Sequence, residues 1–250
     1  MFTETSLRKI KDFSANDPVV SLYLNTEPSR GNAETHRLRL RNMLKDIPLT
    51  QDVEAIEKYF NYSYDWSGRS MAVFSCAPSN FFQTIPLAVP VKDFIQIGSR
   101  AAIQPLEDLL EDYSNLGVIL VDKQGARLFH FQLGELVEQQ GFLGDTVKQV
   151  KSGGSTSAHG LRGGSLDGAR GMQETIDRNL REIAELAARF FEAKHVRRLM
   201  IGGTDENIAR FRAYLPKSLQ SLIVSTFAMS MTVSHAEVLQ KVLHTVQKEA

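Results

Sequence analysis

The stretch GVILVDKQGARLFHFQ, residues 117–132, decides the fold of this chain. It contains two runs rich in β-branched and aromatic residues, which favour strands. Asp122 to Gly125 lies between them and supplies the residue types of a tight turn. A third strand over about residues 135–140 would complete a meander. The sequence therefore predicts that a sheet begins here.

A long amphipathic helix follows this meander. Apolar residues recur at three- and four-residue spacing along one face, with Asp167 as the expected N-cap: Met172, Ile176, Leu180, Ile183, Ala187 and Phe190. Next come the strand RRLMIGG (197–203), a helix over 205–214 and the strand SLIVSTFAM (221–229). Ser234 and Glu237 have capping-box spacing before a final helix. This alternation predicts α/β layering with parallel strand pairing, and with the long helix packed across one sheet.

The N-terminal part predicts a separate α/β domain. We expect a helix over 3–13, a strand over 19–26 and a helix over 33–45. Thr50 is the expected cap of a further helix, with Asp52 in its first turn. Strands should fill 68–90, and a helix over 99–113 should lead to the second domain. The predicted domains are 1–112 and 113–250.

Composition narrows the classes of function. The formal net charge is zero, so any contact with RNA must come from a local basic patch. The single cysteine, Cys76, permits no intramolecular disulfide, and no stretch approaches the roughly 20 apolar residues of a membrane span. We therefore expect a cytoplasmic protein with no membrane partner.

The sequence contains no motif for a metal or a cofactor. The six histidines show no paired spacing, and we expect no metal and no cofactor. The glycines of IGGTDENIARF (201–211) suit tight strand-to-helix packing better than a nucleotide, because the full phosphate-binding motifs are missing. Asp122 fits a turn residue better than a catalytic carboxylate.

The segment KSGGSTSAHGLRGGSLDGAR, residues 151–170, is rich in glycine and small polar residues and precedes the long helix. Such an insertion is either functional or a surface loop with no role. Basic residues outnumber acidic ones around this segment, which suits contacts with an RNA backbone. A solvated face of mixed charge explains them equally well. The basic residues are Lys148, Lys151, Arg162, Arg170, Arg178 and Arg181, and the acidic ones are Asp167, Glu174 and Asp177.

A family resemblance rests on these residues. The run 113–139, the loop with Arg162-Gly163-Gly164, RNLREIAELAARFF (178–191) and VRRLMIGGT (196–204) resemble the middle domain of the eukaryotic and archaeal class-I peptide release factor. DPVVSLYLNTEP (17–28) and the strands ending in PLAVPV (86–91) resemble the bacterial and archaeal branch of that superfamily, the baeRF group.

The resemblance implies an RNase H-like mixed sheet in residues 113–250, with a long helix carrying a glycine-rich loop. In the family, a Gly-Gly-Gln loop enters the peptidyl-transferase centre and helps to position water against the peptidyl-tRNA ester. Here Gly163 and Gly164 match the glycines, but Ser165 stands where glutamine is expected. The resemblance does not extend to the family's third domain or to its codon-reading motifs.

The first hypothesis is a ribosome-associated release or rescue factor, a ribosome-dependent peptidyl-tRNA hydrolase whose catalytic residues are Gly163, Gly164 and Ser165. Its RNA contacts would be His159, Arg162, Arg170, Arg178 and Arg181. Its partners would be the ribosome, peptidyl-tRNA and a translational GTPase. The second hypothesis is a catalytically silent relative that binds tRNA or the ribosome. The third is a protein-binding adaptor on the same fold.

Overall fold

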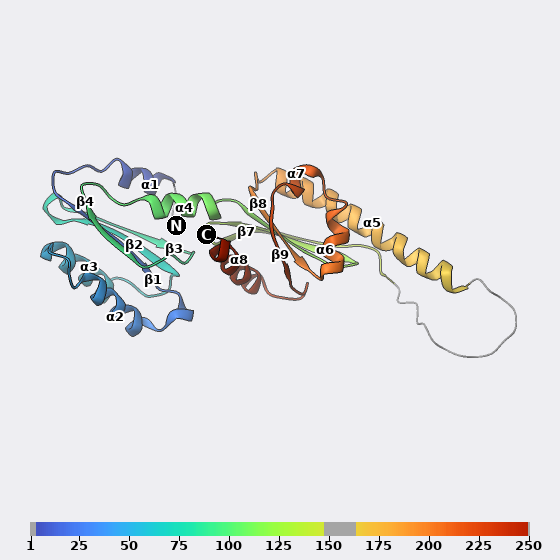
Figure 1. Ribbon diagram of the computed structural model, residues 1–250, viewed down its shortest axis with the longest axis horizontal. Helices are drawn as coiled ribbons and strands as arrows, with labels where there is room; N and C mark the ends of the chain where they lie inside the picture. The colour runs from blue at the N-terminus through green and yellow to red at the C-terminus, as the bar shows by residue number, and fades with distance from the viewer. Residues whose placement is uncertain (1–3, 148–163, 250) are drawn as a thin grey trace. The chain divides into compact units, whose positions relative to one another are not determined.

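The computed structural model describes residues 4–147 and 164–249 (Figure 1). The chain divides into two compact units, each with its own sheet. The first contains Met1–Ser114 and Leu133–Glu135, and the second contains Asn115–Gln132 and Leu136–Ala250. The expected two-domain α/β architecture is therefore confirmed.

The first unit is built on an antiparallel sheet in the order β3-β2-β1-β4. Its strands are β1 (Val19–Asn25), β2 (Ser70–Cys76), β3 (Phe81–Leu87) and β4 (Phe94–Gly98). Its helices are α1 (Glu4–Lys11), α2 (Ala33–Leu44), α3 (Thr50–Tyr62) and α4 (Gln104–Tyr113), with short 3-10 turns η1 (Pro28–Arg30) and η2 (Ala77–Ser79).

Helices α2 and α3 cover one face of this sheet. Alternate residues of β1 point to that face because side chains alternate along a strand. The resulting core contains Val20, Leu22, Leu24, Leu40, Leu44, Ile56, Phe60, Met71 and Val73.

Three expectations for this unit were wrong. Strand β4 was not predicted, and the helix expected from residue 99 begins at Gln104. Pro105 sits in its first turn, where a residue without an amide hydrogen loses no intrahelical bond. The segment before it is instead tied to β1, since Tyr23 donates to the Ala102 carbonyl at 2.6 Å and the Ala102 amide donates to Ser21 at 2.9 Å.

The third error concerns the start of α3. Thr50 is its first residue rather than its cap, which is Leu49. Asp52 is buried, and its carboxylate accepts hydrogen bonds from the Ser75 hydroxyl and the Ala77 amide. This acid therefore joins α3 to the end of β2.

The second unit holds a mixed sheet in the order β7-β6-β5-β8-β9. Its strands are β5 (Leu116–Val121), β6 (Gly125–Gln132), β7 (Glu135–Leu143), β8 (Arg198–Gly203) and β9 (Ile223–Ala228). β5 pairs antiparallel with β6 and parallel with β8, and β8 pairs parallel with β9. The expectation that these strands share one sheet is confirmed.

Helix α5 (Gly164–Glu192) lies on one face of this sheet, as expected, together with α6 (Asp205–Arg212) and α7 (Lys217–Gln220). The core between them includes Ile119 and Val121 of β5 and Ile176, Leu180 and Ile183 of α5.

Helix α8 (His235–Glu249) covers the opposite face. The Lys241 ammonium lies 5.8 Å from the ring centre of Phe227, and Phe227 pairs in register with Gly202 on that face. Val238, Val242, Leu243 and Val246 are buried. The expected capping box is present, since the Ser234 amide donates to Glu237 at 2.8 Å and the Glu237 amide donates to the Ser234 hydroxyl at 3.2 Å.

Two local sequence interpretations agree with the structure. Asp122 is a turn residue whose carboxylate accepts from the amides of Gln124 and Gly125 at 2.8 and 2.7 Å. Gly202 serves packing, because a Cβ there would lie 2.5 Å from a methyl of Leu120 and 2.8 Å from the ring of Phe227.

A buried histidine in this unit makes its stability depend on pH. The His130 ring is 6% exposed; Nε2 lies 3.2 Å from the Asn115 side-chain oxygen, and Nδ1 has no partner among the described residues. Burial, followed by the nearby Lys194 ammonium, lowers the pKa of His130. The folded protein therefore binds a proton at this ring less readily than the unfolded chain does.

We expect the free energy of unfolding to fall as pH drops through about 6.5 and below, because only the unfolded chain gains the proton there. His130→Gln should flatten part of this slope, and His244→Gln, at an exposed position on α8, should not. Urea unfolding between about pH 7.5 and about pH 5.5 measures both. A slope unchanged by His130→Gln would contradict the assignment.

Candidate functional site: the helix that follows the glycine-rich segment

Helix α5 begins at Gly164, directly after the glycine-rich segment. Gly164 and Ser165 are thus the first two helical residues. The sequence suggested that they belong to a loop, and that expectation was wrong. Asp167 is not the N-cap, because the helix starts three residues before it. Glycine lowers helix propensity without forbidding helix, so the glycines did not delay its start as expected. Gly163, His159 and Arg162 lie outside the described residues, as does the rest of the range 148–163.

The N-terminal part of α5, from Gly164, extends beyond the rest of the second unit (Figure 1). Among the described side chains from Arg170 onward, the first buried one is Ile176. Arg170, Gln173 and Glu174 are exposed. Met172 is partly buried and packs against the core, so residues 164–171 extend the helix by roughly 12 Å beyond this contact.

Asn179 fixes this part of α5 to neighbouring backbone. Its side chain is 1% exposed and makes three hydrogen bonds to backbone. The side-chain oxygen accepts from the Asp145 amide at 3.0 Å, and the side-chain NH₂ donates to the carbonyls of Asp145 at 3.0 Å and Lys123 at 3.3 Å. Gly144 gives it room, because a Cβ there would lie 2.4 Å from the Asn179 oxygen. One side chain thus ties α5 to the β5–β6 turn and to the chain leaving β7.

A second contact ties α5 to α6. The Arg210 guanidinium donates to the Asp177 carboxylate at 2.9 Å, and the Tyr214 hydroxyl donates to the same oxygen at 2.6 Å. These hydrogen bonds, that from Tyr214 first, hold the pKa of Asp177 below its usual range. Arg210 also donates to the side chain of Gln173. Gln173 therefore lies inside α5 and has a partner within the protein.

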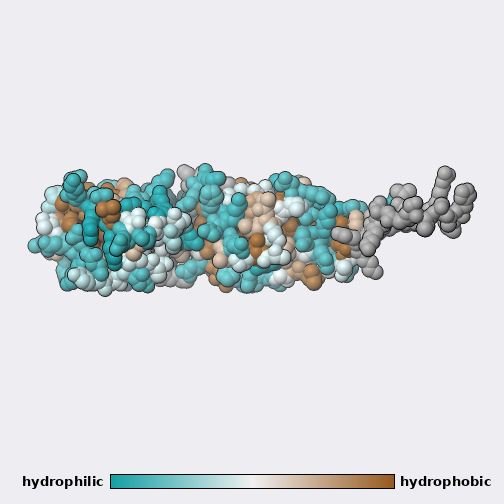
Figure 2. All heavy atoms as spheres, turned by 90° about the horizontal axis from the view of Figure 1, so that it is seen from below, coloured by the Kyte–Doolittle hydropathy of each residue, from teal (hydrophilic) through white to brown (hydrophobic). Residues whose placement is uncertain are grey.

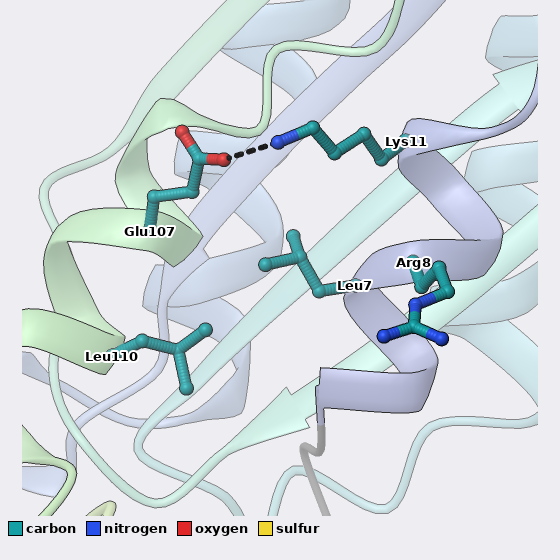
Figure 3. Close-up of a pocket in the computed structure, with 5 residues that line it drawn as sticks. All are labelled: Leu7, Arg8, Lys11, Glu107 and Leu110. Atoms are coloured by element: carbon teal, nitrogen blue, oxygen red, sulfur yellow. Dashed lines mark hydrogen bonds and ion pairs between the residues drawn. The ribbon is translucent and has the colours of Figure 1, made fainter.

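Neither a cavity in the first unit nor any metal-binding cluster among the described residues points to a competing catalytic site. A cavity of about 460 Å³ lies between α1 and α4 in the first unit, lined by Leu7, Arg8, Lys11, Glu107 and Leu110 (Figure 3). Two of its polar groups, Lys11 and Glu107, already pair with each other at 3.2 Å. No three metal-binding side chains cluster among residues 4–147 and 164–249. None of the helices described is long and apolar enough to cross a membrane.

The comparisons with known proteins place this architecture. Residues 102–247, more than half of the chain, match the model of bacterial archaeo-eukaryotic release factor family 10. The chain belongs to this family. No curated protein sequence matches it.

Two solved structures are similar to nearly the whole chain. One, described as an archaeal protein, is 14% identical, covers 97% of this chain and 73% of its own, and has a TM-score of 0.35. The other is the archaeal translation termination factor aRF1, which is 15% identical over 97% of this chain and 73% of its own, with a TM-score of 0.33.

In this family 10 protein, α5 brings the three described candidate arginines onto one exposed face. At 100° per residue, Arg170, Arg178 and Arg181 fall within an arc of about 80°. Glu174 lies in the same arc, and Asp177 lies about 20° outside it. Arg178 pairs with Asp145, and the Arg181 guanidinium lies 5.4 Å from the ring centre of Tyr214. Much of the positive charge on this face is therefore compensated within the protein.

The sequence did not reveal Asn179, Asp145, Arg210 or Tyr214 as parts of this arrangement. One signal was available for Asn179, because it falls within the apolar stripe of α5 beside Ile176 and Leu180. A polar residue at a core-facing position requires buried partners. The other three act through contacts between distant segments, which no local pattern shows.

We expect Asn179→Ala to destabilise the protein by about 1–3 kcal/mol, because it leaves buried backbone groups of Asp145 and Lys123 without partners. The amide of Asp145 should also exchange hydrogen faster. Glu185→Ala, at an exposed position on the same helix, is the matched control and should change neither property. Native-state hydrogen exchange measures both. Unchanged protection at Asp145 would show that Asn179 does not hold this junction.

Proposed function

We propose that this protein is a ribosome-associated release or rescue factor that acts on peptidyl-tRNA through the glycine-rich segment in front of α5. The observation that carries this proposal is the projecting, anchored N-terminal part of α5 in a member of a release-factor family. A rigid helix fixed at Asn179 can present its first residues inside a narrow RNA cavity. We place its action in the cytoplasm, with a translational GTPase as a further partner.

In this proposal Gly163 and Gly164 keep the backbone narrow, and Ser165 orients water. The first amides of a helix have no intrahelical acceptor, and the helix dipole favours negative charge there. The Ser165 amide is therefore suited to stabilise the oxyanion that develops when water attacks the ester. The Ser165 hydroxyl is a second polar group at the same place.

The proposed RNA contacts are His159, Arg162, Arg170, Arg178 and Arg181. Arg170 is exposed and makes no ion pair among the described residues. Arg178 and Arg181 would exchange Asp145 and Tyr214 for phosphate oxygens on binding. Arg170 should therefore contribute more to affinity than the other two described arginines.

One observation favours a second candidate function. Serine replaces the glutamine expected after the glycine pair, which would leave a relative that binds the ribosome or tRNA without cleaving the ester. The two candidates differ in release activity and agree in ribosome binding.

The test is release of peptide from stalled ribosomes by the full-length protein. Gly164→Val should abolish release by crowding the tip of the helix. Gly171→Val is the matched control, because a Cβ at Gly171 meets nothing within 4 Å, and it should retain activity. Ser165→Ala should remain within a few-fold of the unchanged protein if Ser165 acts through its amide, and should lose about 10²-fold if its hydroxyl orients water.

Other outcomes decide between the candidates. Ribosome binding without release, together with a gain of release in Ser165→Gln, would establish the silent relative. An absence of ribosome and tRNA binding at low salt, where phosphate contacts are strongest, would refute both and leave a protein-binding adaptor.

A further inference from the structure

The strongest local excess of positive charge that we find lies in the first unit and involves none of the residues of the glycine-rich segment. Between residues 30 and 45 the sequence holds five basic residues and one acidic residue, Glu34, in a chain with no net charge. The five are Arg30, Arg37, Arg39, Arg41 and Lys45. Arg30 lies in η1, the other three arginines lie in α2, and Lys45 is the C-cap of α2.

Three of these cations form a row. Arg37 and Arg41 of α2 and Lys45 at its C-cap are spaced by four residues, so successive members lie about 6 Å apart along the helix axis and about 40° apart around it. We call them the α2 row. Arg41 and Lys45 are exposed, and no member of the row makes an ion pair within the described part of the chain. Arg39, by contrast, points elsewhere and pairs with Asp93 at 3.2 Å.

The first member of the row is held in place by an aromatic side chain. The Arg37 guanidinium carbon lies 5.2 Å from the ring centre of Trp66, and the His36 ring stacks on the same indole at 6.1 Å. Arg37 Nε and Trp66 Nε1 are buried and have no acceptor among the described residues. Both groups are donors only. The described residues therefore offer no hydrogen-bond acceptor to Arg37 Nε or to Trp66 Nε1.

The surface around the row is polar. Leu38 is the one large apolar residue that α2 exposes. Figure 2 views the molecule from the side of α2 and α3 and shows a mostly hydrophilic surface there, broken by small apolar spots. A stable protein interface needs an apolar centre, which this surface does not offer. The exposed face of α2 also carries no aromatic ring on which a base could stack.

We propose that the α2 row binds the phosphate backbone of RNA, without regard to base sequence. Evenly spaced, unpaired cations on a rigid helix match a chain of evenly spaced phosphates, and each contact releases counterions. Membership of a release-factor family makes RNA the relevant polyanion. This contact is separate from the glycine-rich segment and does not depend on whether that segment hydrolyses an ester.

The test measures binding of the full-length protein to a short single-stranded RNA of mixed sequence. Arg37→Gln/Arg41→Gln/Lys45→Gln should weaken binding at least about tenfold at low salt. It should also reduce the slope of log affinity against log salt by about 2, at about 0.7 per lost phosphate contact. Arg41→Gln/Lys45→Gln leaves the packing on Trp66 intact and should show about two thirds of that change in slope.

The matched control removes the same charge from α1. Arg8→Gln/Lys9→Gln/Lys11→Gln should leave affinity and slope within about twofold of the unchanged protein. Equal loss in the α1 and α2 variants would overturn the proposal, because total charge would then explain the binding. Polyglutamate bound as tightly as RNA would also overturn it, since the row would then fit acidic protein.

Peptide release by the same variants separates the two proposals. RNA binding through the α2 row in a protein that releases no peptide would leave this inference standing and remove the catalytic one. Release activity with RNA affinity unaffected by the α2 variants would do the reverse.

Discussion

The described architecture around α5 depends on one buried carboxamide. Asn179 joins the helix to the backbone of Asp145 and Lys123, and so fixes the places where β7 ends and β5 turns into β6. A hydrophobic contact could hold these segments together but would not set their register, because it has no direction. Hydrogen bonds to three backbone groups are directional and therefore set the register. Together with the contacts of Arg210 and Tyr214 to Asp177, these bonds fix the base from which the helix extends beyond its core contacts.

The two units differ in how far their arginine side chains are ion-paired within the protein. Arg178 of α5 pairs with Asp145, and Arg210 of α6 pairs with Asp177 of α5, which stabilises the position of the helix and leaves less charge for a partner. On α2, the row carries no such compensation among the described residues. The structure thus uses arginine for two purposes, and sequence alone could not distinguish them. Exposed ion pairs of this kind contribute little to stability, so their value lies in orientation.

Local patterns predicted much of the fold. The apolar stripe of α5, the turn at Asp122 and the capping box at Ser234 were all visible, because each depends on residues close in sequence. Strand β4 was missed because its sequence, FIQIG, lies between a proline-containing stretch and a segment that looked helical. The start of α4 was wrong because hydrogen bonds to Ser21 and Tyr23 of β1 hold the preceding residues outside the helix.

The candidate site was harder to predict than the fold. The sequence predicted the long helix and three arginines that share a face of it, but it placed Gly164 and Ser165 in a loop. Asn179, Arg210 and Tyr214 acquire their roles from partners more than 30 positions away along the chain. No periodicity reports such pairs.

The central claim is that α5 delivers its first residues to the peptidyl-tRNA ester. Tethered cleavage tests it directly: Ser165→Cys can be labelled selectively with an iron chelate, because the only native cysteine, Cys76, is buried. With stalled ribosomes, the account predicts cleavage of ribosomal RNA at the peptidyl-transferase centre from position 165 and none there from the exposed position of Ser221→Cys. Equal cleavage from both positions, or cleavage from 165 confined to other regions of the ribosome, would contradict it.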